Sequence, residues 1–262
     1  MANMTSSVSA SQAAGELASA TFEEIPALVE HYREDPRQQV IKACERALKR
    51  HAKELSERER VNGMYELMHE LGGDGVVVGV DEVGRGSVAG PLTVCAVCLP
   101  MEPRIWGIND SKKLTPARRE LLSVKIAEVA TAIGFCHIAP ADIDEMGMAR
   151  AIRAAVAGAV ADTGLEPDCV LMDGNPLGAV PHERDVVKGD AKIACIAAAS
   201  IMAKVTRDEM MVEYDAEYPE YHLAESKGYA SPEHIEAIRK HGLSPLHRVS
   251  FCGNFLQTER LF

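Results

Sequence analysis

The fold is decided by the stretch "VVVGVDEVGRGSVAGPLTVCAVCL", Val76 to Leu99. It begins with an apolar, β-branched run, Val76–Val80, and ends with a second one, Leu92–Leu99, so it predicts two paired strands joined by a glycine-rich turn. Asp81 and Glu82 end the first strand. A charge at the end of a buried strand is costly unless it is paired or bound to a metal ion, so these acids are the starting point for the function.

The rest of the main domain alternates between helical and strand patterns, which predicts an α/β fold. Ser231-Pro232 has the form of a helix start, with an N-cap residue followed by proline. The predicted helices cover 116–129, 149–163 and 191–214, and the predicted strands cover 131–138, 169–172 and the region of 186–187. In the long helix, Ile193, Ile196, Ala197, Ser200 and Ile201 form a narrow stripe that predicts close packing on the sheet.

The N-terminal region has a different composition. We expect a disordered leader over 1–20, a helical extension over 21–72 and one catalytic domain over 73–262, with the glycine-rich "GGDG" at 72–75 as the hinge. The favoured interpretation of the extension is a solvated helix face, and the alternative is a basic arm that touches phosphates. Its basic residues are Arg37, Lys42, Arg46, Lys49, Arg50, Lys53, Arg58 and Arg60.

Composition sets limits on the class of protein. The net charge of −11 argues mildly against broad nonspecific binding of nucleic acid but leaves room for a local basic track. No run of 18 apolar residues is present, so we expect no membrane span. The seven scattered cysteines predict reduced thiols in a cytoplasmic protein. Cys95 and Cys98 would face opposite sides of a strand, so we interpret them as buried side chains rather than metal ligands.

Four carboxylates lie at the boundaries of buried segments, namely Asp81, Glu82, Asp173 and Asp190. Acids at the ends of several strands can converge on one point, and divalent cations relieve their mutual repulsion. Mg²⁺ and Mn²⁺ prefer oxygen ligands, and two such ions can activate water and stabilise the leaving oxygen in phosphodiester hydrolysis. Asp190 also has a simpler interpretation, as a helix cap.

The two adjacent acids present a geometric difficulty. Neighbouring residues of a regular strand point to opposite faces of the sheet. Asp81 and Glu82 therefore cannot both point inward if the strand is regular. We expect the strand to end or bend at Gly84, which would let both carboxylates approach the ions.

Six separated motifs together resemble the ribonuclease HII family, in the same order. The resemblance covers Val76 to Phe251, and "REDPRQQVIKACERALKRHAKE" is similar to a helical extension in one bacterial subgroup. The motifs are "GVDEVGRGSVAGP", "NDSKKLTPARR", "MDGN", "VVKGDAKIACIAAASIMAKVTRD", "SKGYAS" and "LHRVSF". One departure is Ser87, where proline is common in the family.

The resemblance implies a ribonuclease H-like mixed sheet flanked by helices, with a small helical C-terminal part. It implies cleavage of RNA in RNA/DNA hybrids and at ribonucleotides embedded in duplex DNA, on the 5′ side, leaving a 3′-hydroxyl and a 5′-phosphate. Asp81, Glu82, Asp173 and Asp190 correspond to the four metal-binding acids of the family, which use Mg²⁺ or Mn²⁺. We expect the enzyme to act as a monomer.

The turn after the two acids then has an expected role. Gly84, Arg85 and Gly86 match the turn with which the family finds the 2′-hydroxyl, the group that distinguishes RNA from DNA. Tyr229 matches a tyrosine that stacks on the neighbouring sugar, and its alternative is local core packing. Further candidates are Lys112 and Lys113 for phosphates and Lys188 and Lys204 as supports near the acids. His247 and Arg248 match a motif of the family, but the sequence does not indicate their role.

Three other classes of protein compete with this interpretation. Resolvase- or transposase-type nucleases also gather acids around two metal ions, but they need no sensor of the 2′-hydroxyl. In a noncatalytic nucleic-acid-binding module, four acids would be poor phosphate binders without a metal. A dinucleotide-binding protein would need G-x-G-x-x-G followed by a suitable helix, which "GRGSVAG" lacks.

The last residues, "NFLQTERLF" at 254–262, allow two interpretations. In the favoured one, Phe255, Leu256, Leu261 and Phe262 pack back on the protein's own helices. In the other, Gln257 and the Leu-Phe end form a short peptide that binds the bacterial sliding clamp, which would tether the enzyme to DNA behind replication.

Overall fold

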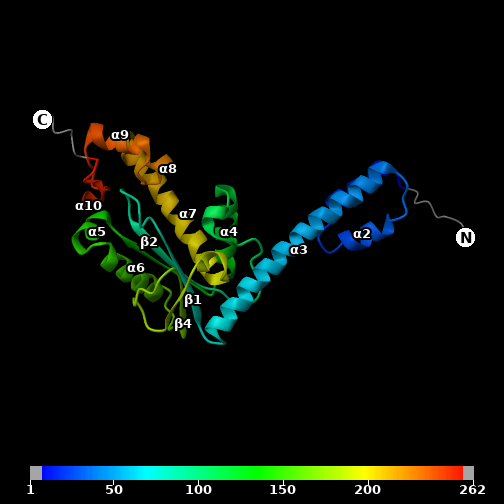
Figure 1. The fold of residues 1–262 in the computed structure, drawn as a ribbon, viewed down its shortest axis with the longest axis horizontal. Helices are drawn as coiled ribbons and strands as arrows, with labels where there is room; N and C mark the ends of the chain where they lie inside the picture. Colours follow the sequence, from blue (N-terminus) through cyan, green and yellow to red (C-terminus); the bar gives the residue numbers. More distant parts are fainter. Residues whose placement is uncertain (1–7, 256–262) are drawn as a thin grey trace, which may run out of the picture. The chain divides into compact units, whose positions relative to one another are not determined.

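The computed structural model describes residues 8–255 and contains a five-stranded mixed sheet flanked by helices (Figure 1). The strand order is β3-β2-β1-β4-β5. The strands are β1 Val77–Val83, β2 Leu92–Cys98, β3 Ala132–Ile138, β4 Cys169–Asp173 and β5 Glu183–Val186. β1, β2 and β3 pair antiparallel, whereas β4 pairs parallel with both β1 and β5. The predicted α/β fold and the predicted hairpin of β1 and β2 are confirmed.

Both faces of the sheet are covered. On one face lies α7, Ala194–Glu217, with α4, Pro116–Val129, beside it, and on the other face lies α6, Met148–Asp162 (Figure 1). The small residues of α7 allow a close approach, because a methyl group added at Gly79 of β1 would lie 2.3 Å from the carbonyl carbon of Cys195. Cys95 and Cys98 face opposite sides of β2, as predicted.

A third cluster of buried residues holds the C-terminal part together. It joins α7 to α9, Pro232–His241, which Ser231 caps by accepting the backbone N–H of His234, as predicted. The remaining short elements are η1 Ser111–Lys113, α5 Pro140–Met146, η2 Gly189–Ala191, η3 Pro219–Tyr221, α8 Leu223–Ser226 and α10 Val249–Cys252. Phe255 packs partly buried against this cluster, while the rest of the tail lies outside the described residues.

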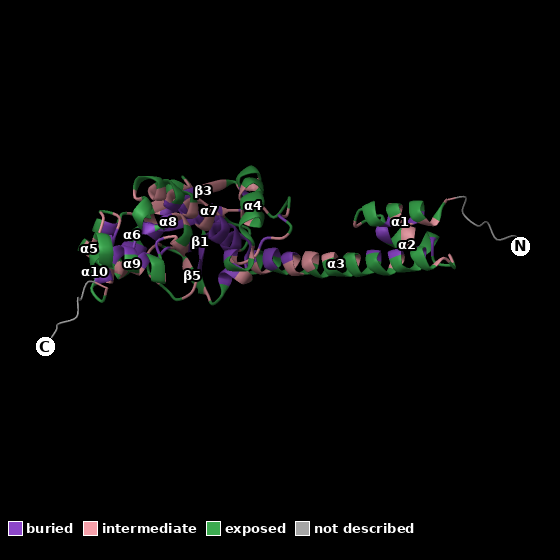
Figure 2. Cartoon of the chain, turned by 90° about the horizontal axis from the view of Figure 1, so that it is seen from above, coloured by how far each residue is buried: buried purple, intermediate pink, exposed green. Residues whose placement is uncertain are grey.

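The N-terminal region forms its own small core, and the expected disordered leader over 1–20 is wrong for residues 10–19. A helix, α1, spans Ala10–Ser19, because Ser9 caps it and its apolar side, with Leu17, is buried. Leu17 packs in one cluster with residues of α2, Ile25–His31, and of the first half of α3, Gln38–Gly72. Figure 2 shows buried residues on all three helices.

The chain divides into two compact units between Arg60 and Val61, inside α3, rather than at the glycine-rich hinge near Gly72. The reason is packing: Val61, Tyr65 and Met68 belong to the apolar cluster of the main unit. Within residues 8–255, no helix is long and apolar enough to cross a membrane.

Candidate active site

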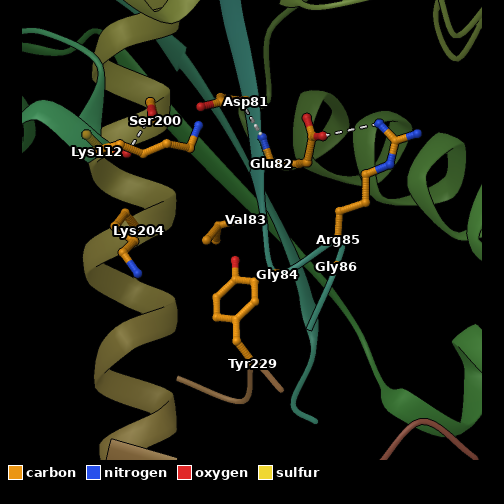
Figure 3. Close-up of a pocket in the computed structure, with 11 residues that line it drawn as sticks. Asp81, Glu82, Val83, Gly84, Arg85, Gly86, Lys112, Ser200, Lys204 and Tyr229 are labelled. Atoms are coloured by element: carbon orange, nitrogen blue, oxygen red, sulfur yellow. Dashed lines mark hydrogen bonds and ion pairs between the residues drawn. The ribbon is translucent and has the colours of Figure 1, made fainter. Parts of the chain in front are cut away.

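Most of the predicted site residues meet at a pocket at the end of β1 (Figure 3). The pocket is bounded by the strand end with its turn, by η1, by α7 and by the loop before α9. Its lining residues are Asp81, Glu82, Val83, Gly84, Arg85, Gly86, Ser111, Lys112, Ser200, Lys204 and Tyr229. Asp173, Asp190 and Lys113, which were predicted from the sequence, do not line it.

Asp81 and Asp173 lie side by side on the face of the sheet that α7 covers. Val80 of β1 pairs with Met172 of the parallel strand β4, so the next residues of the two strands are Asp81 and Asp173. Alternation along each strand places both on the side of Leu171, which packs in the α7 cluster. Asp173 also accepts the backbone N–H of Gly189 at Oδ1, over 2.7 Å.

Asp190 lies in η2, buried, and faces a lysine of the pocket. The Nζ atom of Lys112 is 3.9 Å from Oδ2 of Asp190. Burial lowers the pKa of Lys112, but the charges of Asp81, Asp110 and Asp190 outweigh it and raise the pKa overall. Lys113 instead faces Asp110, 3.8 Å away. Lys112 is therefore the lysine of this pair that is placed beside the acids.

Alternation along β1 directs the side chains of Asp81 and Glu82 to opposite sides of the strand, although both line the pocket at its end. The strand does not end or bend between the two acids as expected, because β1 stays regularly paired with β2 through Val83, yet the charge of Glu82 still raises the pKa of Asp81. Figure 3 shows Glu82 pointing toward Arg85, whose Nη1 lies 3.5 Å from its Oε1. Gly84, with φ +83°, turns the chain only after both acids.

The ionised forms of Asp81, Glu82 and Asp190 are disfavoured by burial and by neighbouring negative charges, which raises their pKa values. Burial, followed by the charge of Glu82, raises the pKa of Asp81 to about 8. Burial also raises the pKa of Glu82, and burial with the charge of Asp173 raises that of Asp190. Within the described part of the chain, no three His, Cys, Asp or Glu side chains are gathered tightly enough to surround one ion. Additional positive charge beside these buried carboxylates would stabilise their ionised forms.

A pair of buried serines connects Asp81 to η1. The Oγ atoms of Ser200 on α7 and Ser111 are hydrogen-bonded over 2.9 Å, and a hydrogen bond from Ser200 to Asp81 lowers the pKa of that carboxyl against the effect of burial. Lys204, one turn further along α7, donates to Oδ1 of Asp208 at 2.7 Å. Lys188 is exposed, outside the pocket.

The turn after the acids is held by hydrogen bonds from a buried serine. Ser87 is fully buried; its backbone N–H and its hydroxyl both donate to the carbonyl of Gly84, at 3.3 and 2.8 Å. A side chain at Gly84 would collide with Arg207, whose Nε lies 2.3 Å from the position of an added Cβ. Glycine is therefore required at this position both by the positive φ and by space.

Two fully buried arginines hold the turn, and sequence reasoning gave neither of them a role. Arg207 donates to Ser87 Oγ and to the carbonyls of Ala89, Pro91 and Lys227, at 2.8 to 3.1 Å. Arg248 donates from Nη1 to the carbonyl of Arg85 and from Nε and Nη2 to that of Gly90. Among residues 8–255, neither guanidinium has an ion pair within 4 Å. Their positive charge is satisfied by backbone carbonyls, which fixes the shape of the turn.

Tyr229 lies on the other side of the pocket, with its ring partly exposed and its hydroxyl directed toward Val83 and Gly84 (Figure 3). The guanidinium carbon of Arg207 is 5.8 Å from the centre of this ring. The carbonyl of Tyr229 is bound by the buried His234. The same arginine therefore supports both the glycine turn and the loop that carries Tyr229.

The sequence contained only indirect signals for these supporting residues. Ser111 and Arg248 lie inside motifs that resemble the family, and Ser200 lies in the small-residue stripe of α7. Arg207 also lies inside a motif that resembles the family, but nothing in the sequence indicated its burial, because an arginine in a helix is ordinarily exposed.

Comparison with known proteins gives a consistent result. A family model described as "Ribonuclease HII" matches residues 78–254, and a second, "Ribonuclease HII N-terminal domain", matches residues 10–71. The chain is 42% identical to a ribonuclease HII of Geobacillus thermodenitrificans over 225 residues, which cover 85% of this chain and 87% of the relative.

Solved structures are similar over much of the chain. A ribonuclease H2 from Pyrococcus horikoshii OT3 superposes with a TM-score of 0.59 and 26% identity, covering 70% of this chain and 99% of the other. The ribonuclease HII in a PCNA complex from Archaeoglobus fulgidus has a TM-score of 0.58 and 25% identity, covering 66% and 94%.

Proposed function

Because the chain belongs to the ribonuclease HII family, hydrolytic endonucleases that cut the RNA of RNA/DNA hybrids, we propose that it also cuts at single ribonucleotides embedded in duplex DNA. The cut falls on the 5′ side of the ribonucleotide and leaves a 3′-hydroxyl and a 5′-phosphate. The substrates are then both RNA/DNA hybrids and duplex DNA that contains ribonucleotides.

One observation carries this proposal: the glycine turn, Tyr229 and Asp81 line the same pocket. An enzyme that requires a continuous RNA strand does not need an aromatic ring that stacks on one neighbouring sugar. A single ribonucleotide, in contrast, must be recognised by its own 2′-hydroxyl and by the nucleotide next to it. Gly84, Arg85 and Gly86 present backbone groups without side-chain obstruction to the 2′-hydroxyl. Tyr229 presents a ring face to the adjacent sugar.

We assign Asp81, Glu82, Asp173 and Asp190 to the binding of two divalent ions, Mg²⁺ or Mn²⁺. The donor set fits such ions, because all four side chains offer carboxylate oxygens, and a bound cation would counter the burial and the charge of Glu82 that raise the pKa of Asp81. When bound, the ions would supply an activated water and stabilise the leaving oxygen. The chain's own contribution is to hold the acids on two neighbouring strands and η2 and to limit access of bulk water to Asp81.

Lys112 is assigned to a phosphate of the substrate, because it is largely exposed at the pocket while its charge faces Asp190. Lys113 is assigned to a neighbouring phosphate outside the pocket. Arg85, with its side chain mostly exposed, is held near Glu82 and so points along the edge of the site.

The test is incubation with a duplex DNA that carries one ribonucleotide, with Mg²⁺ or Mn²⁺, and mapping of both product ends. A matched all-DNA duplex and a duplex with a 2′-O-methyl group at the same position are the controls. A single cut 5′ to the ribonucleotide, absent from both controls, is the expected result. Cleavage of a continuous hybrid alone would contradict the proposal.

We also keep the sliding clamp as a proposed partner of the tail. The archaeal relative above was solved as a complex with PCNA, but residues 256–262 of this chain lie outside the described part. Titration of a labelled peptide of residues 255–262 against the bacterial clamp tests it. The absence of saturable binding at high micromolar clamp would leave only packing of the tail on the protein itself.

A further inference from the structure

The eight basic residues of the N-terminal extension fall into two groups in the structure. Four of them are used inside the N-terminal unit. Arg50 donates to the carbonyls of Leu17, Ala18 and Ala20 at the end of α1, at 2.9 to 3.0 Å. The other three make ion pairs: Arg37 with Asp35, Arg58 with Glu54 and Glu23, and Arg60 with Glu57. These four residues hold the unit together.

The other four, which we call the basic row, are Lys42, Arg46, Lys49 and Lys53. All four are exposed, and none has a hydrogen bond or an ion pair within residues 8–255. Their spacing of four, three and four residues places them within an arc of roughly 60° on one side of α3. The row is about 16 Å long at 1.5 Å per residue. Figure 2 shows exposed positions along this half of α3.

The basic row is unfavourable for the helix taken by itself. Lys42 and Arg46, and likewise Lys49 and Lys53, are like-charged pairs four residues apart, and such pairs destabilise a helix. Glu45 is exposed nearby and offsets only one of the four positive charges of the row. Glu57 is already paired with Arg60. The whole chain carries a net charge of −11, so this face has the opposite sign to the rest of the protein.

We propose that the basic row is a second nucleic-acid contact, which binds the phosphate backbone of a duplex independently of base sequence and of the sugar. The inference rests on the proposed function, since the substrate duplex is the polyanion that an enzyme of this family meets. A duplex strand has a phosphate every ~3.4 Å of axis, so a row of this length faces several phosphates in succession. Lysines and an arginine on long side chains suit such contacts without fixing a register.

The distinguishing property of phosphate contacts is their dependence on salt. Each one releases condensed counterions, so the logarithm of the affinity falls with the logarithm of the salt concentration by about 0.9 per contact. The full-length protein is titrated with fluorescent duplexes in EDTA, which prevents cleavage, over a series of KCl concentrations. One duplex is all DNA and a second carries one ribonucleotide.

Two neighbouring residues provide a matched pair of variants. Lys49→Gln and Arg50→Gln each remove one positive charge from adjacent positions of α3, but only Lys49 belongs to the basic row. We expect Lys49→Gln to reduce the slope by about 0.9 on both duplexes with an unchanged Tm. We expect Arg50→Gln to lower the Tm and to leave the slope unchanged. Equal slopes for both variants and the wild type would overturn the proposal.

The complete row is tested by a combined variant, Lys42→Gln, Arg46→Gln, Lys49→Gln and Lys53→Gln. The expected loss of slope is about 3–4, because four contacts are removed. A control that changes the three lysines to arginine keeps the charge and should keep the slope. Loss of binding to vesicles with anionic lipid, together with an unchanged slope on duplexes, would assign the row to a membrane surface and overturn it for nucleic acid.

The outcome is separable from that of the proposed function. The row variants keep the whole catalytic pocket, so the position of the cut and kcat at saturating substrate should match the wild type while KM rises. If the wild type fails to cut at a single ribonucleotide, the proposed function fails, and the slope on the all-DNA duplex still decides the role of the row.

Discussion

His234 and His247 share one proton between their Nε2 atoms, which lie 3.1 Å apart in the buried C-terminal cluster. Nδ1 of His247 accepts the backbone N–H of Ser244, so its proton lies on Nε2 and is donated to His234. His234 then carries its own proton on Nδ1 and donates it to the carbonyl of Tyr229, over 2.9 Å. The two rings form a directed chain from a backbone N–H to the loop that carries Tyr229.

The first prediction is that the two histidines are opposite neutral tautomers at pH 7. His247 should be protonated on Nε2 and His234 on Nδ1, because an amide donor fixes one end of the chain and a carbonyl acceptor the other. Long-range ¹H–¹⁵N NMR spectra of the imidazoles distinguish these forms. A proton on Nδ1 of His247 would contradict the assignment.

The second prediction concerns stability at acid pH. Burial, followed by the neighbouring His234, lowers the pKa of His247 from 6.5 to about 4. Because the pKa is lower in the folded state, the contribution is complete above pH 6.5 and is lost as pH falls toward 4, by about 3 kcal/mol in total. Urea unfolding at a series of pH values measures this. A free energy of unfolding that stays constant from pH 6.5 to 4.5 would disagree with it.

The third prediction is that Asp81→Asn abolishes turnover while the folded protein persists. We expect a loss of at least about 100-fold, since even outer partners of a metal site commonly contribute 10–100-fold. In EDTA the variant should have a higher Tm than the wild type, because it removes a buried carboxylate whose pKa is raised to about 8. Added Mn²⁺ should raise the Tm of the wild type more than that of the variant. Turnover near that of the wild type would remove Asp81 from the catalytic set.

The fourth prediction separates the ring of Tyr229 from its hydroxyl. Tyr229→Ala should lower kcat/KM at a single embedded ribonucleotide about 10-fold, on the scale of 1–3 kcal/mol for stacking on an aromatic ring. Tyr229→Phe should stay within about 3-fold of the wild type, because it keeps the platform. Steady-state kinetics on the single-ribonucleotide duplex gives both values. If the alanine variant is as active as the wild type, the ring serves packing alone.

The fifth prediction concerns the hydroxyl of Ser87. Ser87→Ala leaves a guanidinium N–H of Arg207 and a lone pair of the Gly84 carbonyl without this partner, so it should cost about 1–3 kcal/mol of stability. Since Arg207 also holds the carbonyl of Lys227, we expect KM at a single ribonucleotide to rise more than KM on a continuous hybrid. Thermal unfolding and kinetics on both substrates measure this. An equal rise in KM on both would reduce Ser87 to a purely structural residue.

The parts of the fold that follow local patterns were predictable. The helix predicted over 116–129 is α4 with the same bounds, because Thr115 caps it and Pro116 starts it. The strands β1 and β2 pair as predicted, since both are continuous apolar runs with one turn between them. The small-residue stripe of α7 also predicted the close approach to the sheet.

The parts that depend on tertiary neighbours were not predictable. The helix α1 is stabilised by burial of Leu17 and by Arg50, which lies 33 residues after Leu17 in the chain. The side of the sheet that Glu82 faces depends on β1 staying paired through Val83, which local sequence does not determine. The burial of Arg207 depends on carbonyls of two distant segments that converge on it.

The close contact between Gly79 and Cys195 makes the enzyme sensitive to any side chain added at position 79. A methyl group at position 79 would lie 2.3 Å from a backbone carbon, so relief to a normal contact requires a displacement of about 1 Å. The helix that would have to move also carries Ser200 and Lys204 into the pocket. Misplacement of reacting groups by 1 Å can cost about 100-fold in rate. The lack of a side chain at Gly79, which does not line the pocket, thus keeps α7 close enough to the sheet to place Ser200 and Lys204 correctly.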